Sequence, residues 1–267
     1  MNQRFGEHDF AVILGASSGF GEATAIELSR RGLHICGVHL DRRGTMPHVQ
    51  QVIAEIEKNG RRALFFNINA ADEEKRRDTV AKLKGEIGNG FVRVLLHSLA
   101  FGTLKPLLAE KQEDQVNPAQ MNMTLDVMAH SLIYWTQDLL RAGLLRSGSR
   151  IFAMTSLGSV LAAANYGPVS AAKSALESHM RQLTLELAPN GITVNAIRAG
   201  VTETPSLQKI PGHEKMMEAA FARNPSGRLT TPLDVARAIG VLADPDTYWL
   251  TGNVINVDGG EMFVGTK

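Results

Sequence analysis

Cysteine is almost absent from this sequence. Cys36 is the only one in 267 residues, so no disulfide can form within the chain, and its apolar surroundings predict a buried structural thiol. Lysine and arginine form no block and the net charge is +1, which argues against a nucleic-acid partner. No apolar run reaches the ~18 residues of a membrane span, and residues 1–10 lack the apolar core of a signal peptide. We therefore expect a cytoplasmic protein with no membrane partner, and we predict no metal site.

Short apolar runs alternate with helical patterns along the chain. The predicted strands are Phe10–Leu14, Leu33–Leu40, Arg62–Ile68, Val92–Leu96, Arg150–Met154, Ile192–Ile197 and Val254–Val257. The predicted helices are Glu22–Arg31, Thr45–Asn59, Asp72–Ile87, Pro118–Leu145 and one that contains Lys173 and ends at Ala188. This alternation predicts an α/β fold: a Rossmann-type doubly wound parallel sheet of seven strands with helices on both faces. No linker divides the chain, so residues 1–267 are expected to form one domain.

Residues 202–228 interrupt the alternation. They are rich in Met and Ala, contain Pro205, Pro211 and Pro225, and suggest two short helices. Because the segment follows the carboxyl end of a predicted strand, we expect a mobile substrate-binding lid, with an ordinary helical excursion as the alternative. Its basic residues Lys209, Lys215 and Arg223 are candidates for a rim that attracts an acidic partner.

The first predicted strand runs into a glycine-rich turn, Gly15-Ala16-Ser17-Ser18-Gly19-Phe20-Gly21, and then into a helix. Glycines let the backbone approach a pyrophosphate, and the free N–H groups of a helix N-terminus attract its charge. Strand, turn and helix together predict a dinucleotide-binding site, although the spacing is G-x-x-x-G-x-G rather than G-x-G-x-x-G.

The end of the second predicted strand should lie beside the adenosine ribose of that dinucleotide. Asp41, Arg42 and Arg43 follow there. An acid favours the ribose hydroxyls of NAD, whereas an arginine accommodates the 2′-phosphate of NADP. The two adjacent arginines favour NADPH, with NADH as the alternative because of Asp41.

Tyr166 and Lys173 lie seven residues apart in a predicted helix. At ~100° per residue this separation is nearly two turns, so both side chains project from nearly the same helix face. An ammonium beside a phenol favours phenolate character, which makes the pair a candidate for chemistry on a substrate oxygen. The alternative is an ordinary amphipathic helix with a surface lysine and a half-buried tyrosine.

Together these motifs resemble the short-chain dehydrogenase/reductase family over nearly the whole chain. The resemblance is carried by Gly15, Gly19, Gly21, Tyr166, Lys173, Asn195–Gly200, Thr204 and the segment from Thr251 to Gly260. It implies that Lys173 holds the nicotinamide ribose, that Tyr166 binds the substrate oxygen, that Ser156 helps to orient that oxygen, and that the protein is a homotetramer. The cofactor-binding residues expected on this basis are Gly15, Ser17, Ser18, Gly19, Phe20, Gly21, Arg42, Arg43, Asn69, Ser98, Leu99, Ala100, Lys173, Ala199, Gly200, Val201, Thr202 and Thr204.

The chain departs from the main branch of that family, in which the tyrosine stands four residues before the lysine. Val169 occupies that position and cannot do acid–base chemistry, so Tyr166 gives a Y-x6-K spacing. This spacing, the segment His97–Phe101 and Ala199 resemble the enoyl-acyl-carrier-protein reductase branch, and Ser156 resembles its type III members. Met128 aligns with the main-branch asparagine, so we expect no lysine–water–asparagine relay.

The resemblance implies NAD(P)H-dependent reduction of the C=C bond of a trans-2-enoyl thioester in fatty acid biosynthesis, on acyl-carrier protein or a small acyl thioester. Hydride addition to the β-carbon leaves negative charge on the thioester oxygen. A tyrosine displaced by one helical turn, about 5.4 Å, stands in the direction of that oxygen. Tyr166 would stabilise the enolate as an oxyanion hole does. A 3-oxoacyl or carbonyl reductase, or a hydroxysteroid dehydrogenase, is the alternative enzyme, and a non-catalytic cofactor-sensing module is the alternative of another class.

Side chains beyond this set have weaker signals. Phe101, Met154, Met216 and Phe221 are candidates for an acyl channel because flexible methionine suits a variable chain, with core packing as the alternative for each. His97 is expected to be a structural histidine at the end of a strand.

Overall fold

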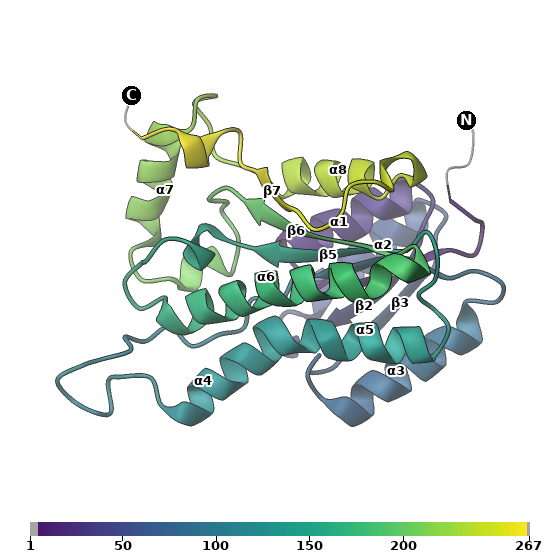
Figure 1. The fold of residues 1–267 in the computed structure, drawn as a ribbon, viewed down its shortest axis with the longest axis horizontal. Coiled ribbons are helices and arrows are strands. Elements are labelled where there is room, and N and C mark those ends of the chain that lie inside the picture. Colours follow the sequence, from purple (N-terminus) through teal and green to yellow (C-terminus); the bar gives the residue numbers. More distant parts are fainter. Residues whose placement is uncertain (1–4, 266–267) are drawn as a thin grey trace.

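The computed structural model describes residues 5–265 and contains a seven-stranded sheet (Figure 1). Neighbouring strands are parallel throughout, in the order β3-β2-β1-β4-β5-β6-β7. The strands are β1 (Phe10–Leu14), β2 (His34–His39), β3 (Ala63–Asn67), β4 (Val92–His97), β5 (Arg150–Thr155), β6 (Thr193–Ala199) and β7 (Val254–Val257). The strand order reverses between β1 and β4, which is where doubly wound sheets bind ligands at the carboxyl ends of the strands.

Helices cover both faces of the sheet. They are α1 (Gly19–Arg30), α2 (Met46–Lys58), α3 (Glu73–Glu86), α4 (Pro118–Leu125), α5 (Ser131–Arg141), α6 (Gly167–Leu187), α7 (His213–Arg223) and α8 (Pro232–Leu242). One core cluster contains residues of α1, α2 and α8, and another contains residues of α3, α5 and α6. Figure 1 shows α1 and α8 above the sheet and α5 and α6 below it. The predicted Rossmann-type α/β fold is confirmed.

Burial on both faces explains the apolar composition of the central strands. All five residues of β1 are buried, as are all six of β2 and of β5. Cys36 lies inside β2, and burial raises the pKa of its thiol to about 12, as expected for a structural cysteine. The predicted bounds of β1 and β7 match the observed ones, and the ends of the other strands differ by at most two residues.

Three segments differ from the sequence-based expectation. The single helix predicted for 118–145 consists of α4, a π-helical turn at Asp126–His130 and α5, which ends at Arg141. Helix α8 was not predicted, although Thr231 and Asp234 form a capping box around its start. Within 202–228, a 3₁₀ turn (Leu207–Lys209) precedes α7, so only one of the two expected helices exceeds a single turn.

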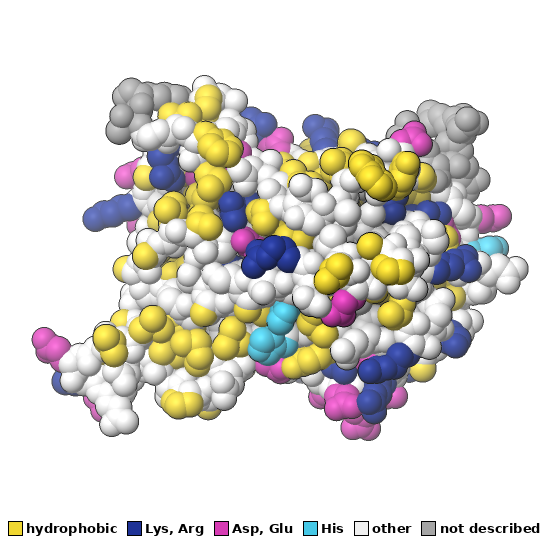
Figure 2. Space-filling model, in the orientation of Figure 1, with side chains coloured by type: hydrophobic (Ala, Val, Ile, Leu, Met, Phe, Trp, Pro, Cys, Tyr) yellow, Lys and Arg dark blue, Asp and Glu magenta, His cyan; other side chains and the backbone are white. Residues whose placement is uncertain are grey.

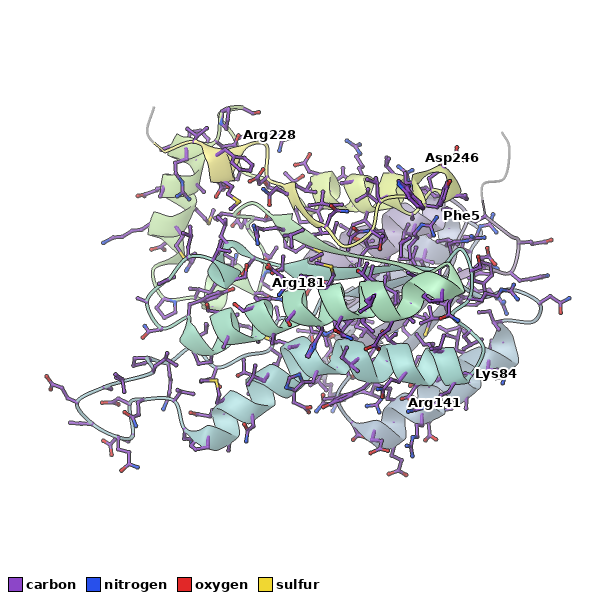
Figure 3. All side chains as sticks on the ribbon, in the orientation of Figure 1. Phe5, Lys84, Arg141, Arg181, Arg228 and Asp246 are labelled. Carbon is purple, nitrogen blue, oxygen red and sulfur yellow. The ribbon has the colours of Figure 1, made fainter. Side chains whose placement is uncertain are left out.

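The carboxyl ends of the strands mark one end of the molecule. The arrowheads of β5 and β6 point toward α7 in Figure 1. Figure 3 labels Arg228 at that end and Phe5 and Asp246 at the opposite end. Among residues 5–265, no helix has both the length and the apolar character that crossing a membrane requires.

Candidate functional site

Ser156, Tyr166 and Lys173 lie where β5 ends and α6 begins. Ser156 directly follows β5, Tyr166 directly precedes α6, and Lys173 is two turns into that helix. The hydroxyl oxygens of Ser156 and Tyr166 are 3.5 Å apart. A Cβ atom added to Gly158 would lie 2.4 Å from Cε1 of Tyr166, so the main chain of the turn after β5 lies against the tyrosine ring.

Asn165 turns the chain into α6. Among the residues that the structure describes, it is the one non-glycine residue with a positive φ, at 60°. Asparagine adopts this left-handed conformation more readily than most residues. The direction from which Tyr166 enters the site therefore depends on Asn165.

The ammonium group of Lys173 faces the ends of two strands. The side chain is buried, and Nζ donates to the carbonyl oxygens of Met154 at 2.7 Å and Leu99 at 3.5 Å. Burial lowers the pKa of Lys173 to about 8, while the negative charge of Glu177 opposes this shift. Lys173 therefore loses its proton far more readily than an exposed lysine.

The pKa of Tyr166 is raised, because burial disfavours the phenolate and the Ser156 hydrogen bond offsets only part of that effect. The expectation that Lys173 gives Tyr166 phenolate character is therefore wrong. The physical reason is that desolvation of the phenol dominates, and the Lys173 ammonium is bound to main-chain carbonyls. A protonated Tyr166 can donate a hydrogen bond to a substrate oxygen.

Val169, four residues before Lys173, is a core residue. It is only 4 % exposed and belongs to the core cluster under α5 and α6. A Cβ atom on Gly102 would lie 2.8 Å from both Val169 Cγ2 and Met128 Sδ, so the main chain after β4 closes over both side chains. The side chains of Val169 and Met128 are therefore packed against the main chain at Gly102.

The glycine loop between β1 and α1 fits a dinucleotide. A Cβ atom on Gly15 (φ +91°) would lie 2.3 Å from the Ser98 carbonyl oxygen, and one on Gly21 would lie 1.9 Å from the Gly15 carbonyl oxygen. Neither position has room for a side chain. Ser18, the N-cap of α1, makes no side-chain capping bond, and Gly19 has a positive φ of 57°. A helix N-terminus reached by such a loop suits the pyrophosphate of NAD(P).

At the end of β2, an acid is more firmly held than the two arginines beside it. The Asp41 carboxylate lies 3.0 Å from Nδ1 of His39. Burial opposes ionisation of Asp41, but hydrogen bonds from Ser17, Thr45 and His39 outweigh it and lower the pKa. The side chains of the expected cofactor residues Arg42 and Arg43 are exposed.

The loops after β4 and β6 also reach the glycine loop. The Ser98 N–H donates to the Leu14 carbonyl oxygen at 2.9 Å and so joins the end of β4 to that of β1. A Cβ atom on Gly19 would lie 3.4 Å from Cγ2 of Thr204, in the loop after β6. These loops therefore meet at the carboxyl ends of the strands, where the strand order reverses between β1 and β4.

The remaining expected cofactor residues lie at the same edge of the sheet. Asn69 and Ala100 are exposed and follow β3 and β4, and Phe20 is the second residue of α1. Ala199 ends β6, and Gly200 and Thr202 follow it, with the Thr202 hydroxyl donating to the Gly200 carbonyl oxygen at 2.9 Å. Contacts with a cofactor stay a prediction for all of them.

Sequence reasoning missed two buried glutamates at this edge. Glu177 accepts hydrogen bonds from Thr155 at 2.7 Å and Arg198 at 3.0 Å. Glu261 accepts from the Val201 N–H at 3.1 Å. For Glu177 a signal existed, because a residue four positions after Lys173 lies on the same helix face. For Glu261 the sequence carries no local signal, since its partners are distant in the chain.

The weaker sequence signals have mixed outcomes. Met154 is a buried core residue rather than a channel residue, whereas Phe101 and Phe221 are more than half exposed. Lys209 and Lys215 are exposed, but Arg223 lies 3.5 Å from the buried Glu261 carboxylate and so faces partly inward.

His97 is fully buried at the end of β4, with Nε2 2.9 Å from the Ser131 hydroxyl. Burial lowers the pKa of His97 to about 3, which agrees with a structural rather than an acid–base role.

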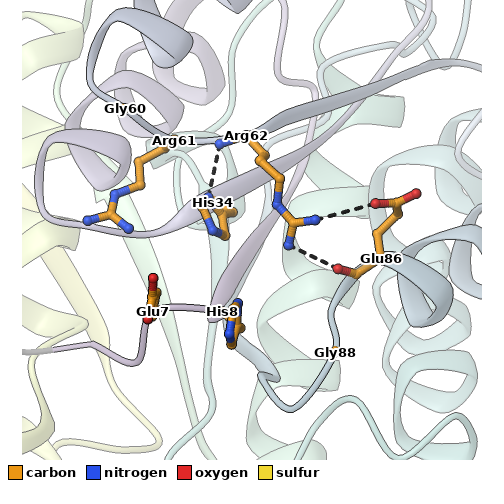
Figure 4. Close-up of a pocket in the computed structure, with 8 residues that line it drawn as sticks. All are labelled: Glu7, His8, His34, Gly60, Arg61, Arg62, Glu86 and Gly88. Carbon is orange, nitrogen blue, oxygen red and sulfur yellow. Dashed lines mark hydrogen bonds and ion pairs between the residues drawn. The ribbon is translucent and has the colours of Figure 1, made fainter.

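A cavity of about 410 Å³ lies at the other end of the sheet, near the amino ends of β1, β2 and β3 (Figure 4). It is lined by both acidic and basic groups, and Arg62 is already paired with Glu86 at 3.3 Å. Ligands of doubly wound sheets bind at the carboxyl ends instead. Within 5–265, no three His, Cys, Asp or Glu side chains are grouped so that they could hold a metal ion.

Known proteins resemble this chain over nearly its full length. The family model described as Enoyl-(Acyl carrier protein) reductase matches residues 15–261. The chain is 25% identical over 258 residues to 3-oxoacyl-[acyl-carrier-protein] reductase FabG of Vibrio cholerae serotype O1, covering 97% of this chain and 99% of that protein. The same protein name recurs among further relatives.

Two other similarities bear on reaction and cofactor. The chain is 28% identical over 259 residues to 1-cyclohexenylcarbonyl-CoA reductase of Streptomyces collinus, covering 95% of this chain and 87% of that protein. A short chain dehydrogenase from Burkholderia cenocepacia J2315, solved in complex with NADP, has a TM-score of 0.81 and 25% identity, covering 97% of this chain and 99% of that one. This chain therefore belongs to the family described as Enoyl-(Acyl carrier protein) reductase, within the short-chain dehydrogenases/reductases, and is an oxidoreductase.

Proposed function

We propose that this chain reduces the C=C bond of a 2-enoyl thioester with NAD(P)H. The observation that supports this most is the pairing of Tyr166 with Ser156, while the buried Val169 occupies the position four residues before Lys173. The donor hydroxyl thus comes from the loop side of α6, which suits an oxygen that is three bonds away from the carbon receiving hydride, whereas a ketone oxygen is one bond away. The other two tyrosines, Tyr134 on α5 and Tyr248 after α8, lie on other elements.

Each residue of the site has a separate role in the proposed reaction. A nicotinamide bound beside the glycine loop supplies the hydride for the β-carbon. Tyr166 keeps its proton, since burial raises its pKa, and donates a hydrogen bond to the thioester oxygen as negative charge develops there. Ser156 orients that hydroxyl or the same oxygen, and Lys173 fixes the ribose and adds positive charge below about pH 8. A proton from water completes the α-carbon, so one hydride and one proton saturate the double bond.

Reduction of a 3-oxoacyl thioester is the second candidate, and the relatives support it at least as well. Several of them are named 3-oxoacyl-[acyl-carrier-protein] reductase. In this reaction Tyr166 would give its proton to the ketone oxygen, and Ser156 would orient that oxygen. The name 1-cyclohexenylcarbonyl-CoA reductase, by contrast, describes a thioester with a conjugated C=C bond and supports the first candidate.

The cofactor is NADH or NADPH, and NADPH stays our expected preference. The NADP-bound relative and the exposed Arg42 and Arg43 support it. Asp41 supports NADH, because an ionised carboxylate beside Ser17 repels a 2′-phosphate and can accept from a ribose hydroxyl.

Acyl-carrier protein is the proposed carrier of the substrate, and a small acyl thioester is the alternative. Figure 2 shows Lys and Arg side chains exposed over α7, beside hydrophobic ones. A carrier rich in acidic residues would dock there through electrostatic complementarity. We also propose that residues 202–228 act as the lid over the substrate. The homotetramer and the cytoplasmic location stay predictions.

The test is a rate comparison between crotonyl and acetoacetyl thioesters, each on coenzyme A and on acyl-carrier protein, with NADH and with NADPH. Cofactor oxidation gives the rate, and mass spectrometry identifies the saturated or hydroxylated product. We expect kcat/KM to be at least ~10-fold higher for the crotonyl substrate, which corresponds to ~1.4 kcal/mol. The reverse ratio would establish the second candidate, and turnover of neither would contradict both.

A further inference from the structure

We propose that Glu177 is a positioning residue that holds the turn carrying Ser156 against the helix carrying Tyr166 and Lys173. This inference rests on the proposed function, because it concerns the same hydroxyl groups. Glu177 lies one turn beyond Lys173 on α6 and is not among the site residues that the sequence predicts.

The contacts of Glu177 bracket the turn on both sides. Its Oε1 accepts from the hydroxyl of Thr155, directly before Ser156, at 2.7 Å. The same oxygen accepts from Nη2 of Arg198 at 3.0 Å, and that guanidinium also donates to Oγ of Ser159 at 3.2 Å. Residues 155 and 159 are thus tied to one carboxylate, with Ser156 between them.

This clamp is buried, so its contacts count for more than a surface ion pair would. The Glu177 side chain is 10% exposed and that of Arg198 is 9% exposed. Removing one partner of a buried pair leaves an uncompensated charge and is costly. Two neutral contacts add to it from α6, because Ser170 donates to the Gly158 carbonyl oxygen and Ser174 donates to that of Ser159.

The turn after β5 contacts Tyr166 directly, so the position of the turn affects that of the tyrosine. Gly158 lies so close to the Tyr166 ring that an added Cβ atom would overlap it, and Ser156 Oγ lies 3.5 Å from the Tyr166 hydroxyl. A turn that moved away from α6 would therefore release the ring and separate the two hydroxyls. A misplacement on the scale of 1 Å in a reacting group costs on the order of 100-fold in rate.

Glu177 also sets the charge around Lys173. Burial lowers the pKa of Lys173 and the Glu177 carboxylate opposes this shift. Two other charged or titratable groups act on this pair, Arg198 on β6 and His97 on β4. Burial keeps His97 neutral near pH 7. Loss of the carboxylate should move the titration of Lys173 to lower pH.

The experiment compares Glu177→Gln with Glu186→Gln on whichever substrate the wild-type enzyme reduces. Glu186 is an exposed residue of the same helix that accepts from Gln182, so its variant is the matched control. We expect Glu177→Gln to lower kcat by ~10-fold or more, to change KM and cofactor affinity little, and to shift the basic limb of the pH profile to lower pH. Wild-type kcat and an unshifted limb in Glu177→Gln would overturn the proposal.

Two neutral variants cover the outcome in which Glu177→Gln fails to fold. Thr155→Val and Ser159→Ala each remove one contact of the clamp without changing its charge. A lower kcat in either variant, with an unchanged melting temperature, supports the proposal, whereas wild-type kcat in both overturns it. Failure of the proposed function would be distinct, because it is measured on the wild-type enzyme, which would then prefer the acetoacetyl thioester or turn over neither thioester.

Discussion

The two buried glutamates near the carboxyl ends of the strands, Glu177 and Glu261, hold different loops and differ in their electrostatic surroundings. Burial opposes ionisation of Glu177, but hydrogen bonds from Thr155, Ser159 and Arg198 outweigh it and lower the pKa. Its carboxylate is therefore stabilised by the fold, and the turn after β5 is held by a charge that persists at neutral pH.

Glu261 is the opposite case. It is 1% exposed, and its pKa is raised because burial outweighs the Val201 N–H bond and the positive charge of Arg223, 3.5 Å away. Its contacts reach both ends of the segment between β6 and the end of α7. The loop with the proposed catalytic hydroxyls is thus held by a carboxylate that the fold keeps ionised, whereas the proposed lid is anchored by an acid that is costly to ionise.

Tyr166→Phe tests whether the site held by Glu177 contains the catalytic hydroxyl. We expect kcat to fall by ~10²–10³-fold, about 3–4 kcal/mol, with KM little changed, because the donor acts as charge develops. Steady-state kinetics measure both parameters. Tyr134→Phe, which loses only a hydrogen bond to Asp126 on the α4–α5 segment, is the matched control. Near-normal turnover by Tyr166→Phe would remove Tyr166 from the mechanism.

Lys173→Met tests how much the buried ammonium of Lys173, in the same site, lowers the free energy of unfolding. The folded-state pKa of Lys173 is about 8 against an ordinary value of 10.5, so the unfolded chain binds more protons between these values. The cost to stability is fully present below pH 8, at up to ~3 kcal/mol, and is relieved as pH rises to 10.5.

Denaturant unfolding of both proteins from pH 7 to pH 10.5 measures this difference. Wild-type stability should rise relative to Lys173→Met across that interval, while the variant loses activity. A constant difference would show that Lys173 is not desolvated as the structure indicates.

Glu261→Gln has the smallest expected effect, and it tests whether the fold shifts the pKa values of the two buried glutamates in opposite directions. A raised pKa means that the folded chain binds more protons than the unfolded one above 4.5, so wild type should lose stability relative to the variant as pH rises. For Glu177→Gln the slope should be opposite, with the wild-type advantage lost as pH falls.

We expect Glu261→Gln to change the unfolding free energy by ~1 kcal/mol or less at pH 7, since the amide keeps one acceptor oxygen. Thermal unfolding as a function of pH measures it, with the exposed Glu214→Gln of α7 as the control. Slopes of the same sign for both buried glutamates would contradict the contrast between them.

Local patterns in the chain sufficed to predict most of the fold. Buried strands such as β1 are continuous apolar runs, and the glycine turn marks the start of α1. Both features are predictable because each signal is contained in a few neighbouring residues. The ends of α4 and α5 were predicted less well, since a π-helical turn keeps the helical hydrophobic pattern while shifting its phase. Helix α8 was missed although its capping box is local.

The site could be predicted only in part. Tyr166, Lys173 and Ser156 lie within eighteen consecutive residues, so their proximity follows from one strand and one helix. The contribution of Arg198 to the clamp depends on pairing between β5 and β6, and that of Glu261 depends on a segment sixty residues beyond Val201. The phenolate expectation failed for the same kind of reason, because desolvation of Tyr166 depends on packing that helix geometry alone does not give.

Tyr166 stands before the first turn of α6 rather than inside the helix, and residues 160–164 leading to it are exposed loop. Surface loops accept insertions and deletions that helices do not. A change of a few residues there would alter the path by which the chain reaches Tyr166 while leaving the spacing of Tyr166 and Lys173, β5 and the nucleotide loop unchanged. The approach to the proposed catalytic hydroxyls can therefore vary in length independently of the buried core that holds them.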